Sequence, residues 1–171
     1  RGHAGGPSQA EVNALRAQYQ SGHYAVAEKL AAEMTQKHPS HAFGWTVLGA
    51  VFRTSGMLHD SLIANQKAVA LAPSDARAQN NFGSALKDLG RPEEAEASYR
   101  QAIALKPDFA EAHSNLGGAL KDLGRLEEAE ASYRQAIALE PDFADAHYNL
   151  GNTLKDLGRL EEAEASYRQA I

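Results

Sequence analysis

The chain has 171 residues, a formal net charge of -5 and 43% hydrophobic residues, enough for an independently folded protein. It contains no cysteine, which excludes disulfides and thiolate metal sites and fits a cytoplasmic location best. The mild acidity argues against a dedicated nucleic-acid-binding protein, and no apolar run approaches the roughly 18 residues that a membrane span needs.

The N-terminal segment RGHAGGP, residues 1–7, has the composition of a flexible linker or an expression remnant. No secretion signal opens the chain, which begins at Arg1 rather than at a methionine. Its last residues stop inside a repeated segment. We therefore expect the chain to be part of a longer protein.

From residue 8 onward the sequence repeats with a period of 34 residues. The segments 110–137 and 144–171 differ at only four positions: Glu111/Asp145, Ser114/Tyr148, Gly118/Asn152 and Ala119/Thr153. The same period divides the chain into units 8–41, 42–75, 76–109, 110–143 and 144–171, of which the last is incomplete. A repeat of this length predicts an all-α fold of stacked helix–turn–helix units.

Each unit is expected to contain two helices, as the fourth unit illustrates. A short, Leu-rich first helix at 109–122 precedes Gly124, a residue suited to the left-handed turn that stops a helix. The second helix opens with Glu127 and Glu128, whose charges complement the positive end of its dipole. It is expected to end before Pro141, which cannot continue it.

Side-chain contacts at the helix surfaces can also be predicted. Asp108 and Asp142 are expected to cap the first helices that follow them, and Asp108 with Glu111 has the spacing of a capping box. Glu130 and Arg134 lie four residues apart on the second helix. We expect them to pair weakly on its exposed side.

Small residues recur inside the predicted helices. Gly117 and Gly151 fall in the middle of first helices, where glycine costs about 1 kcal/mol relative to alanine. Repetition of this cost predicts that the second helix lies so close that a side chain would not fit. Ala129 and Ala136 on the second helix indicate the same, and Tyr133 is expected to pack between the helices.

These features resemble the signature of the tetratricopeptide repeat, most fully in Trp45, Leu48, Gly49, Phe52, Ala68 and Pro73. The resemblance covers residues 8–171 and implies a right-handed superhelical solenoid whose first helices line a concave groove. The style of the repeats also resembles the superhelical arm of O-linked N-acetylglucosamine transferases and their bacterial relatives. The first unit is irregular, with Ala14 and Leu15 where the others have Leu–Gly or Phe–Gly, and looks like a capping repeat.

In those transferases, a ladder of asparagines holds the backbone of an extended polypeptide. The resemblance implies this role for Asn81, Asn115 and Asn149, while Val47 interrupts the ladder in the second unit. An Asn amide offers both a donor and an acceptor, so it can bind a peptide unit without reading its side chain. The alternative is a structural role, with the amides bonded to the adjacent helix.

Comparison of 76–103 with 110–137, and of 110–137 with 144–171, finds three sites that change both times: Arg77/Glu111/Asp145, Asn80/Ser114/Tyr148 and Ser84/Gly118/Asn152. They share one face of the first helix, which predicts a ligand-binding groove. Arg77 favours acidic ligand groups, whereas Glu111 and Asp145 favour basic or hydroxyl groups. The alternatives are helix caps for Glu111 and Asp145, and an ordinary exposed ring for Tyr148.

A second ladder of lysines borders this face, with an aspartate following each one. Its members are Lys87, Lys121 and Lys155, beside Asp88, Asp122 and Asp156. They are either part of the groove or solvated charges between repeats, and surface pairs of this kind contribute little to stability.

The seven histidines do not predict a metal site or a catalytic centre. His113 and His147 stand where Trp45 stands in the second unit, so we expect a half-buried packing role. No phosphate loop, nucleophile elbow or metalloprotease motif occurs. We therefore expect no metal, no cofactor and no catalysis by this chain.

The favoured hypothesis is a protein–protein interaction scaffold that binds an extended polypeptide in the groove, with no nucleic-acid or membrane partner. One alternative is the substrate-recruiting arm of a larger glycosyltransferase. Another is a homo-oligomer formed through the uncapped C-terminal repeat. Its exposed apolar edge is expected to include Leu150, Leu154 and Leu157.

Overall fold

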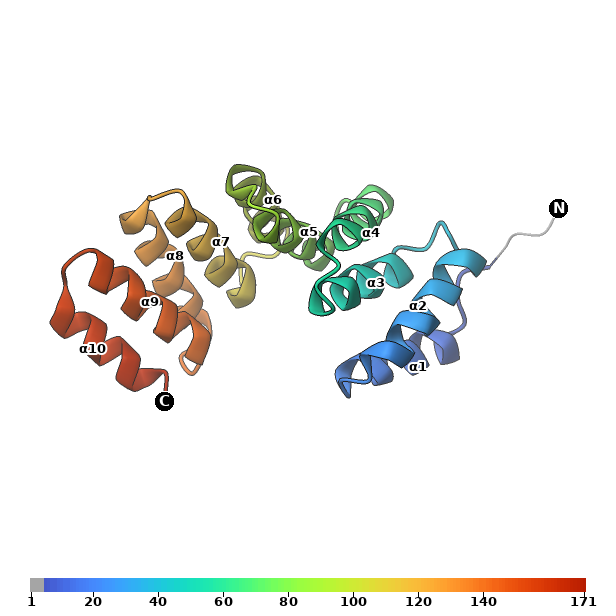
Figure 1. Ribbon diagram of the computed structural model, residues 1–171, viewed down its shortest axis with the longest axis horizontal. Helices are drawn as coiled ribbons and strands as arrows, with labels where there is room; N and C mark the ends of the chain where they lie inside the picture. Colours follow the sequence, from blue (N-terminus) through green and yellow to red (C-terminus); the bar gives the residue numbers. More distant parts are fainter. Residues whose placement is uncertain (1–4) are drawn as a thin grey trace. The chain divides into compact units, whose positions relative to one another are not determined.

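The computed structural model describes residues 5–171, which form ten α-helices (Figure 1). They are α1 (Gln9–Gln20), α2 (Tyr24–Lys37), α3 (Ala42–Thr54), α4 (Leu58–Leu71), α5 (Ala76–Asp88), α6 (Pro92–Leu105), α7 (Ala110–Asp122), α8 (Leu126–Leu139), α9 (Ala144–Asp156) and α10 (Leu160–Gln169). The predicted all-α helical repeat fold is confirmed. The predicted linker, residues 1–7, lies in part outside the described residues.

The chain divides into two compact units, one ending at Leu89 and the other running from Gly90 to Ile171. The N-terminal unit contains α1–α5, and the C-terminal unit contains α6–α10. Within the first, α3 contacts α2, α4 and α5; within the second, α7 contacts α6, α8 and α9. First helices of neighbouring repeats therefore lie side by side inside each unit.

The turns and helix ends follow from glycine and proline, as predicted. Gly124 has a φ of +73°, a left-handed conformation that strains any residue with a Cβ. The turn glycines at the other four equivalent positions also have positive φ. The second helices α6 and α8 end at Leu105 and Leu139, two residues before a proline.

The predicted aspartate caps are wrong. The N-cap positions of α7 and α9 are Phe109 and Phe143, and neither makes a side-chain capping hydrogen bond. Asp108 and Asp142 each lie one residue before the cap, because the turn after the proline takes one more residue before the helix begins. The capping-box interpretation of the Asp108–Glu111 spacing is therefore wrong as well.

Side-chain caps occur instead in the N-terminal unit. The Ser8 hydroxyl accepts a hydrogen bond from the Glu11 amide at 3.2 Å, and the Glu11 carboxylate accepts one from the Ser8 amide at 2.8 Å. This reciprocal pair is a capping box at the start of α1. The Asp75 carboxylate caps α5 by accepting from the amides of Arg77 and Ala78.

The close approach of paired helices is confirmed at the mid-helix glycines. A Cβ built on Gly117 would lie 2.8 Å from the Tyr133 ring, and one on Gly151 would lie 2.6 Å from the Tyr167 ring. Tyr133 is buried as predicted, and its burial raises the pKa of its phenol. The missing side chain on α7 thus makes room for an aromatic ring from α8.

The N-terminal unit fills the same space with polar groups. Ser61 and Asn65 of α4 occupy the positions that Ala129 and Tyr133 hold on α8, and both are buried. The Ser61 hydroxyl donates to the Gly49 carbonyl at 2.8 Å, and the Asn65 Nδ2 donates to the Ser61 carbonyl at 2.9 Å. The Asn65 Oδ1 is buried without a hydrogen-bond partner in the described part of the chain.

Candidate functional site

A pocket of about 590 Å³ lies between α7 and α9, wholly within the C-terminal unit. Its first wall comes from the turn before α7 and from the start of that helix. Its second wall comes from the equivalent turn and from α9. The polar and aromatic lining residues are Lys106, Asp108, Phe109, Glu111, Ser114, Asn115, Glu140, Phe143, Asp145 and Asn149. We call this space the α7–α9 pocket.

The structure brings five of the predicted groove residues together at the α7–α9 pocket. They are Glu111, Ser114, Asn115, Asp145 and Asn149. Residues four apart lie on one face of a helix, and the 34-residue period places equivalent residues on helices that contact each other. Two members of the predicted asparagine ladder therefore line one pocket.

Two polar side chains of the α7–α9 pocket lack partners. Ser114 is only 7% exposed, yet its hydroxyl makes no hydrogen bond within the described residues. The half-buried Asn149 amide also has no partner among them. By contrast, the Thr153 hydroxyl on the same helix bonds back to the Asn149 carbonyl at 2.9 Å.

The pocket lining is mainly acidic. It includes four carboxylates, from Asp108, Glu111, Glu140 and Asp145, against one cationic side chain, Lys106. A concave surface lined by one sign of charge concentrates counter-charges from solution. The α7–α9 pocket is therefore suited to a positively charged group.

The turns before the first helices contribute pocket residues that the sequence comparison missed. Phe109 and Phe143 line the pocket from equivalent positions, and so do Lys106 and Glu140. All four lie outside the 28-residue segments whose differences indicated the groove. The sequence did contain one indication of these residues: Lys106 and Glu140 occupy equivalent positions in neighbouring repeats but carry opposite charges.

The lysine ladder takes part in contacts between repeats. Lys121 Nζ lies 3.4 Å from Asp156 Oδ2, which joins α7 to α9. Arg53, at the equivalent position of α3, forms a hydrogen-bonded ion pair with Asp88 of α5. These contacts favour the interpretation of the lysine ladder as solvated charges between repeats rather than as part of the groove. Lys155 is exposed on α9, and Lys87 is half-buried on α5.

Tyr148 and Asn152 lie beside the tyrosine of α10. The Tyr167 hydroxyl donates to Asn152 Oδ1 at 2.7 Å. The rings of Tyr148 and Tyr167 have centroids 5.7 Å apart, and Tyr148 remains 55% exposed. Asn152 thus contributes to helix packing, whereas Tyr148 presents an aromatic surface to solvent.

The remaining predicted groove residues lie on α5, in the N-terminal unit. Arg77 is exposed and Asn81 is half-buried. Asn80 and Ser84 are buried, with exposures of 1% and 6%. The Ser84 hydroxyl donates to the Asn80 carbonyl at 3.1 Å, one turn earlier on the same helix.

One position of the first helix bonds to the preceding turn in four repeats. His147 Nε2 lies 2.7 Å from the Pro141 carbonyl oxygen, and His113 makes the same contact with Pro107 at 2.9 Å. Trp45 and Gln79 make the equivalent hydrogen bond to Pro39 and Pro73. An N–H donor is thus the shared chemistry of this position. No group of three or more potential ligands in the described residues is arranged to hold a metal ion.

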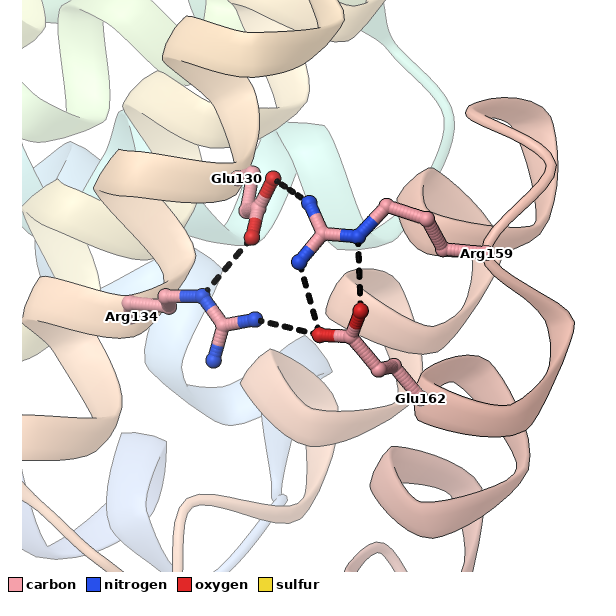
Figure 2. A network of polar contacts seen from close by, with 4 residues as sticks. All are labelled: Glu130, Arg134, Arg159 and Glu162. Carbon is pink, nitrogen blue, oxygen red and sulfur yellow. Dashed lines mark hydrogen bonds and ion pairs between the residues drawn. The ribbon is translucent and has the colours of Figure 1, made fainter.

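An ion-pair network joins α8 to the turn and helix that follow α9 (Figure 2). Glu130 accepts from Arg134 at 2.9 Å and from Arg159 at 2.6 Å, and Arg159 also donates to both oxygens of Glu162. The Glu130 side chain is only 14% exposed. The predicted Glu130–Arg134 pair is therefore present, but the expected exposure is wrong for Glu130, because its carboxylate lies between two guanidinium groups. The same network recurs one repeat earlier around Glu96 and Arg125.

The predicted apolar edge of the last repeat is also wrong in two of its members. Leu150 and Leu154 are buried, with exposures of 3% and 1%, because α10 and α8 pack on α9. Leu157 is half-buried. The large exposed apolar side chains in this region are Tyr148, Leu160 and Ile171.

Models of the tetratricopeptide repeat match residues 12–76, 83–124, 117–158 and 146–171. No curated protein matches the chain. The resemblance to the transferase arm stays one of sequence style. None of the helices in the described part of the chain has the length and apolar character that a membrane crossing requires.

Several solved structures share the fold. TTC0263, a thermophilic TPR protein of Thermus thermophilus, is 25% identical with a TM-score of 0.81, over 95% of this chain and 89% of that one. PilF of Pseudomonas aeruginosa is 21% identical with a TM-score of 0.82, over 94% of this chain and 73% of that one. YrrB, described as a TPR protein with an unusual peptide-binding site, is 22% identical with a TM-score of 0.71, over 96% of this chain and 85% of that one.

Proposed function

Because the chain belongs to the tetratricopeptide repeat family, we propose that it is a protein-interaction module that binds an extended polypeptide at the α7–α9 pocket. The observation that carries the proposal is the placement of Asn115 and Asn149 at equivalent positions around one pocket. The structural likeness to YrrB, a TPR protein with a peptide-binding site, supports it. The cytoplasmic location favoured by the cysteine-free sequence is part of the proposal.

The proposed mechanism is recognition of the peptide backbone. The Asn149 amide can donate to a carbonyl and accept from an N–H of the same extended chain. The Ser114 hydroxyl offers a further donor and acceptor within the pocket. Main-chain contacts of this kind hold many sequences in one register, and the side chains around them set the preference. The module acts by holding its partner in place, so it requires no catalytic group.

The proposal is tested by replacing the unpaired amide. A peptide array probed with the full chain identifies a bound peptide, whose affinity is then measured by fluorescence anisotropy. We expect Asn149→Ala to weaken binding about five- to tenfold, the effect of losing one or two hydrogen bonds. Circular dichroism should show unchanged helicity, because Asn149 makes no side-chain hydrogen bond within the described residues.

The matched control is Gln101→Ala, which removes an amide from the exposed surface of α6. Its affinity should equal that of the unaltered chain. Equal affinities for Asn149→Ala and the control would show that the Asn149 amide does not contribute to peptide binding.

A further inference from the structure

We infer that the α7–α9 pocket receives a basic side chain, an arginine or lysine, of the bound polypeptide. This inference rests on the proposed function and adds to it the chemistry that sets ligand preference. Three independent features of the pocket support it: its charge, the surroundings of its two phenylalanine rings, and its unpaired polar groups.

The first feature is an excess of negative charge inside a concave surface. Four carboxylates line the α7–α9 pocket with a single ammonium group. In a cleft, such charges attract an opposite charge more strongly than they do on an open surface. They are not arranged as a metal site, because no group of three potential ligands in the described residues can hold a metal ion. A cation carried by the polypeptide is therefore the favoured occupant.

The second feature is a difference between two equivalent aromatic rings. Lys106 Nζ lies 5.2 Å from the centroid of the Phe109 ring, so this ring already has a cation over it. At the equivalent position beside Phe143, the chain has Glu140 instead of a lysine. Within the described residues, no cation lies over Phe143. A ligand cation could therefore contact the Phe143 ring and pair with Glu140 in a single placement.

The third feature is the pair of polar groups without partners. Ser114 is more than nine-tenths buried as a residue, lines the pocket, and its hydroxyl makes no hydrogen bond within the described residues. The Asn149 amide is also unpaired there. A guanidinium group presents five N–H donors in a planar fork, which suits a site with several oxygen acceptors around an aromatic ring. We therefore expect arginine to be preferred over lysine.

The experiment uses the peptide found by the array, with one position varied. The variants carry arginine, lysine, citrulline or glutamate at that position, and citrulline keeps the shape of arginine without its charge. We expect the arginine peptide to bind the full chain about five- to tenfold more tightly than the citrulline peptide at low salt. The difference should shrink as salt is added, because screening weakens the charge term.

The protein variants locate this preference in the pocket. The double variant Glu140→Gln with Asp145→Asn should bring the affinities for the arginine and citrulline peptides within about twofold of each other. The control Glu161→Gln with Glu127→Gln removes the same charge from exposed residues outside the pocket and should leave the preference intact. Equal affinities of the unaltered chain for both peptides, or equal effects of the two double variants, would overturn the inference.

The outcome separates the inference from the proposed function. If Asn149→Ala weakens every peptide but arginine and citrulline bind alike, the backbone-binding function stands and the basic preference fails. If no peptide binding depends on Asn149, the proposed function fails first.

Discussion

The helix pairs α3–α4 and α7–α8 build the same close contact from different side chains. In the C-terminal unit, Gly117 makes room for the ring of Tyr133. In the N-terminal unit, Gly49 makes room for Asn65, and the buried Ser61 and Asn65 side chains form hydrogen bonds to the backbone. In these two helix pairs the glycine leaves space for either an aromatic ring or polar side chains, whereas the irregular first repeat has the buried Leu15 at the equivalent position.

The two fillings should differ in how much they stabilise the helix pair. An aromatic ring buries a large apolar surface, which is the main source of stability in a core. The polar filling also contains one buried oxygen, Asn65 Oδ1, without a partner among the described residues, and such a group carries a desolvation cost. The α7–α8 pair should therefore depend more strongly on its central side chain.

The largest expected effect is that of Tyr133→Ala. We expect a loss of about 3–5 kcal/mol in the free energy of unfolding, because the change leaves a cavity beside Gly117. The matching change Asn65→Ala should cost about 1 kcal/mol, the net value of its hydrogen bond to Ser61. Chemical denaturation followed by circular dichroism measures both. Equal losses would show that the polar filling contributes as much as the ring.

An intermediate effect is expected from Gly117→Ala. The new methyl group would lie 2.8 Å from the Tyr133 ring, and overpacking of this kind costs about 1–3 kcal/mol. The gain in helix propensity, about 1 kcal/mol, offsets part of this cost. We expect a net loss of about 1 kcal/mol in the same denaturation experiment.

The sign of this effect should reverse when the ring is absent. In a Tyr133→Ala background, Gly117→Ala should stabilise the chain by about 1 kcal/mol, because only the helix propensity remains. A loss in both backgrounds would contradict the close contact as the reason for the glycine.

The smallest expected effect is the pH dependence of stability that comes from two hydrogen-bonded carboxylates. The hydrogen bond from Arg159 lowers the pKa of Glu162, whereas in the N-terminal unit the hydrogen bonds from Ser8 lower that of Glu11. Each carboxylate therefore stabilises its unit fully above the ordinary glutamate pKa of about 4.3, and this contribution is lost as the pH falls through the lowered value. NMR titration of the side-chain carboxyls should place both midpoints below the ordinary value.

Two changes distinguish these carboxylates. Arg159→Gln should raise the midpoint of Glu162 and leave that of Glu11 unchanged, because Arg159 bonds to Glu162 but not to Glu11. Ser8→Ala should raise the midpoint of Glu11 and leave that of Glu162 unchanged. If Arg159→Gln leaves the titration midpoint of Glu162 unchanged, the network in Figure 2 does not persist in solution.

The chain's own copies made much of the fold predictable. The turn glycines, the prolines after second helices and the mid-helix glycines were all visible as 34-residue repetitions, and each has one local physical explanation. The capping prediction failed at Asp108, because an aspartate near a helix start can lie at the cap or one residue before it. Sequence spacing does not distinguish these two positions, since only the backbone geometry of the turn decides which residue caps the helix.

The sequence by itself determined the repeated helix pairs, because glycine, proline and helical periodicity act through neighbours along the chain. It also indicated that Asn115 and Asn149 share a face with Glu111 and Asp145. Only the tertiary structure decided which side chains meet across repeats. It buried Leu150 and Leu154, shared Glu130 between two arginines, and added Phe143 to the pocket. These outcomes depend on distances between helices, which periodicity along one helix does not specify.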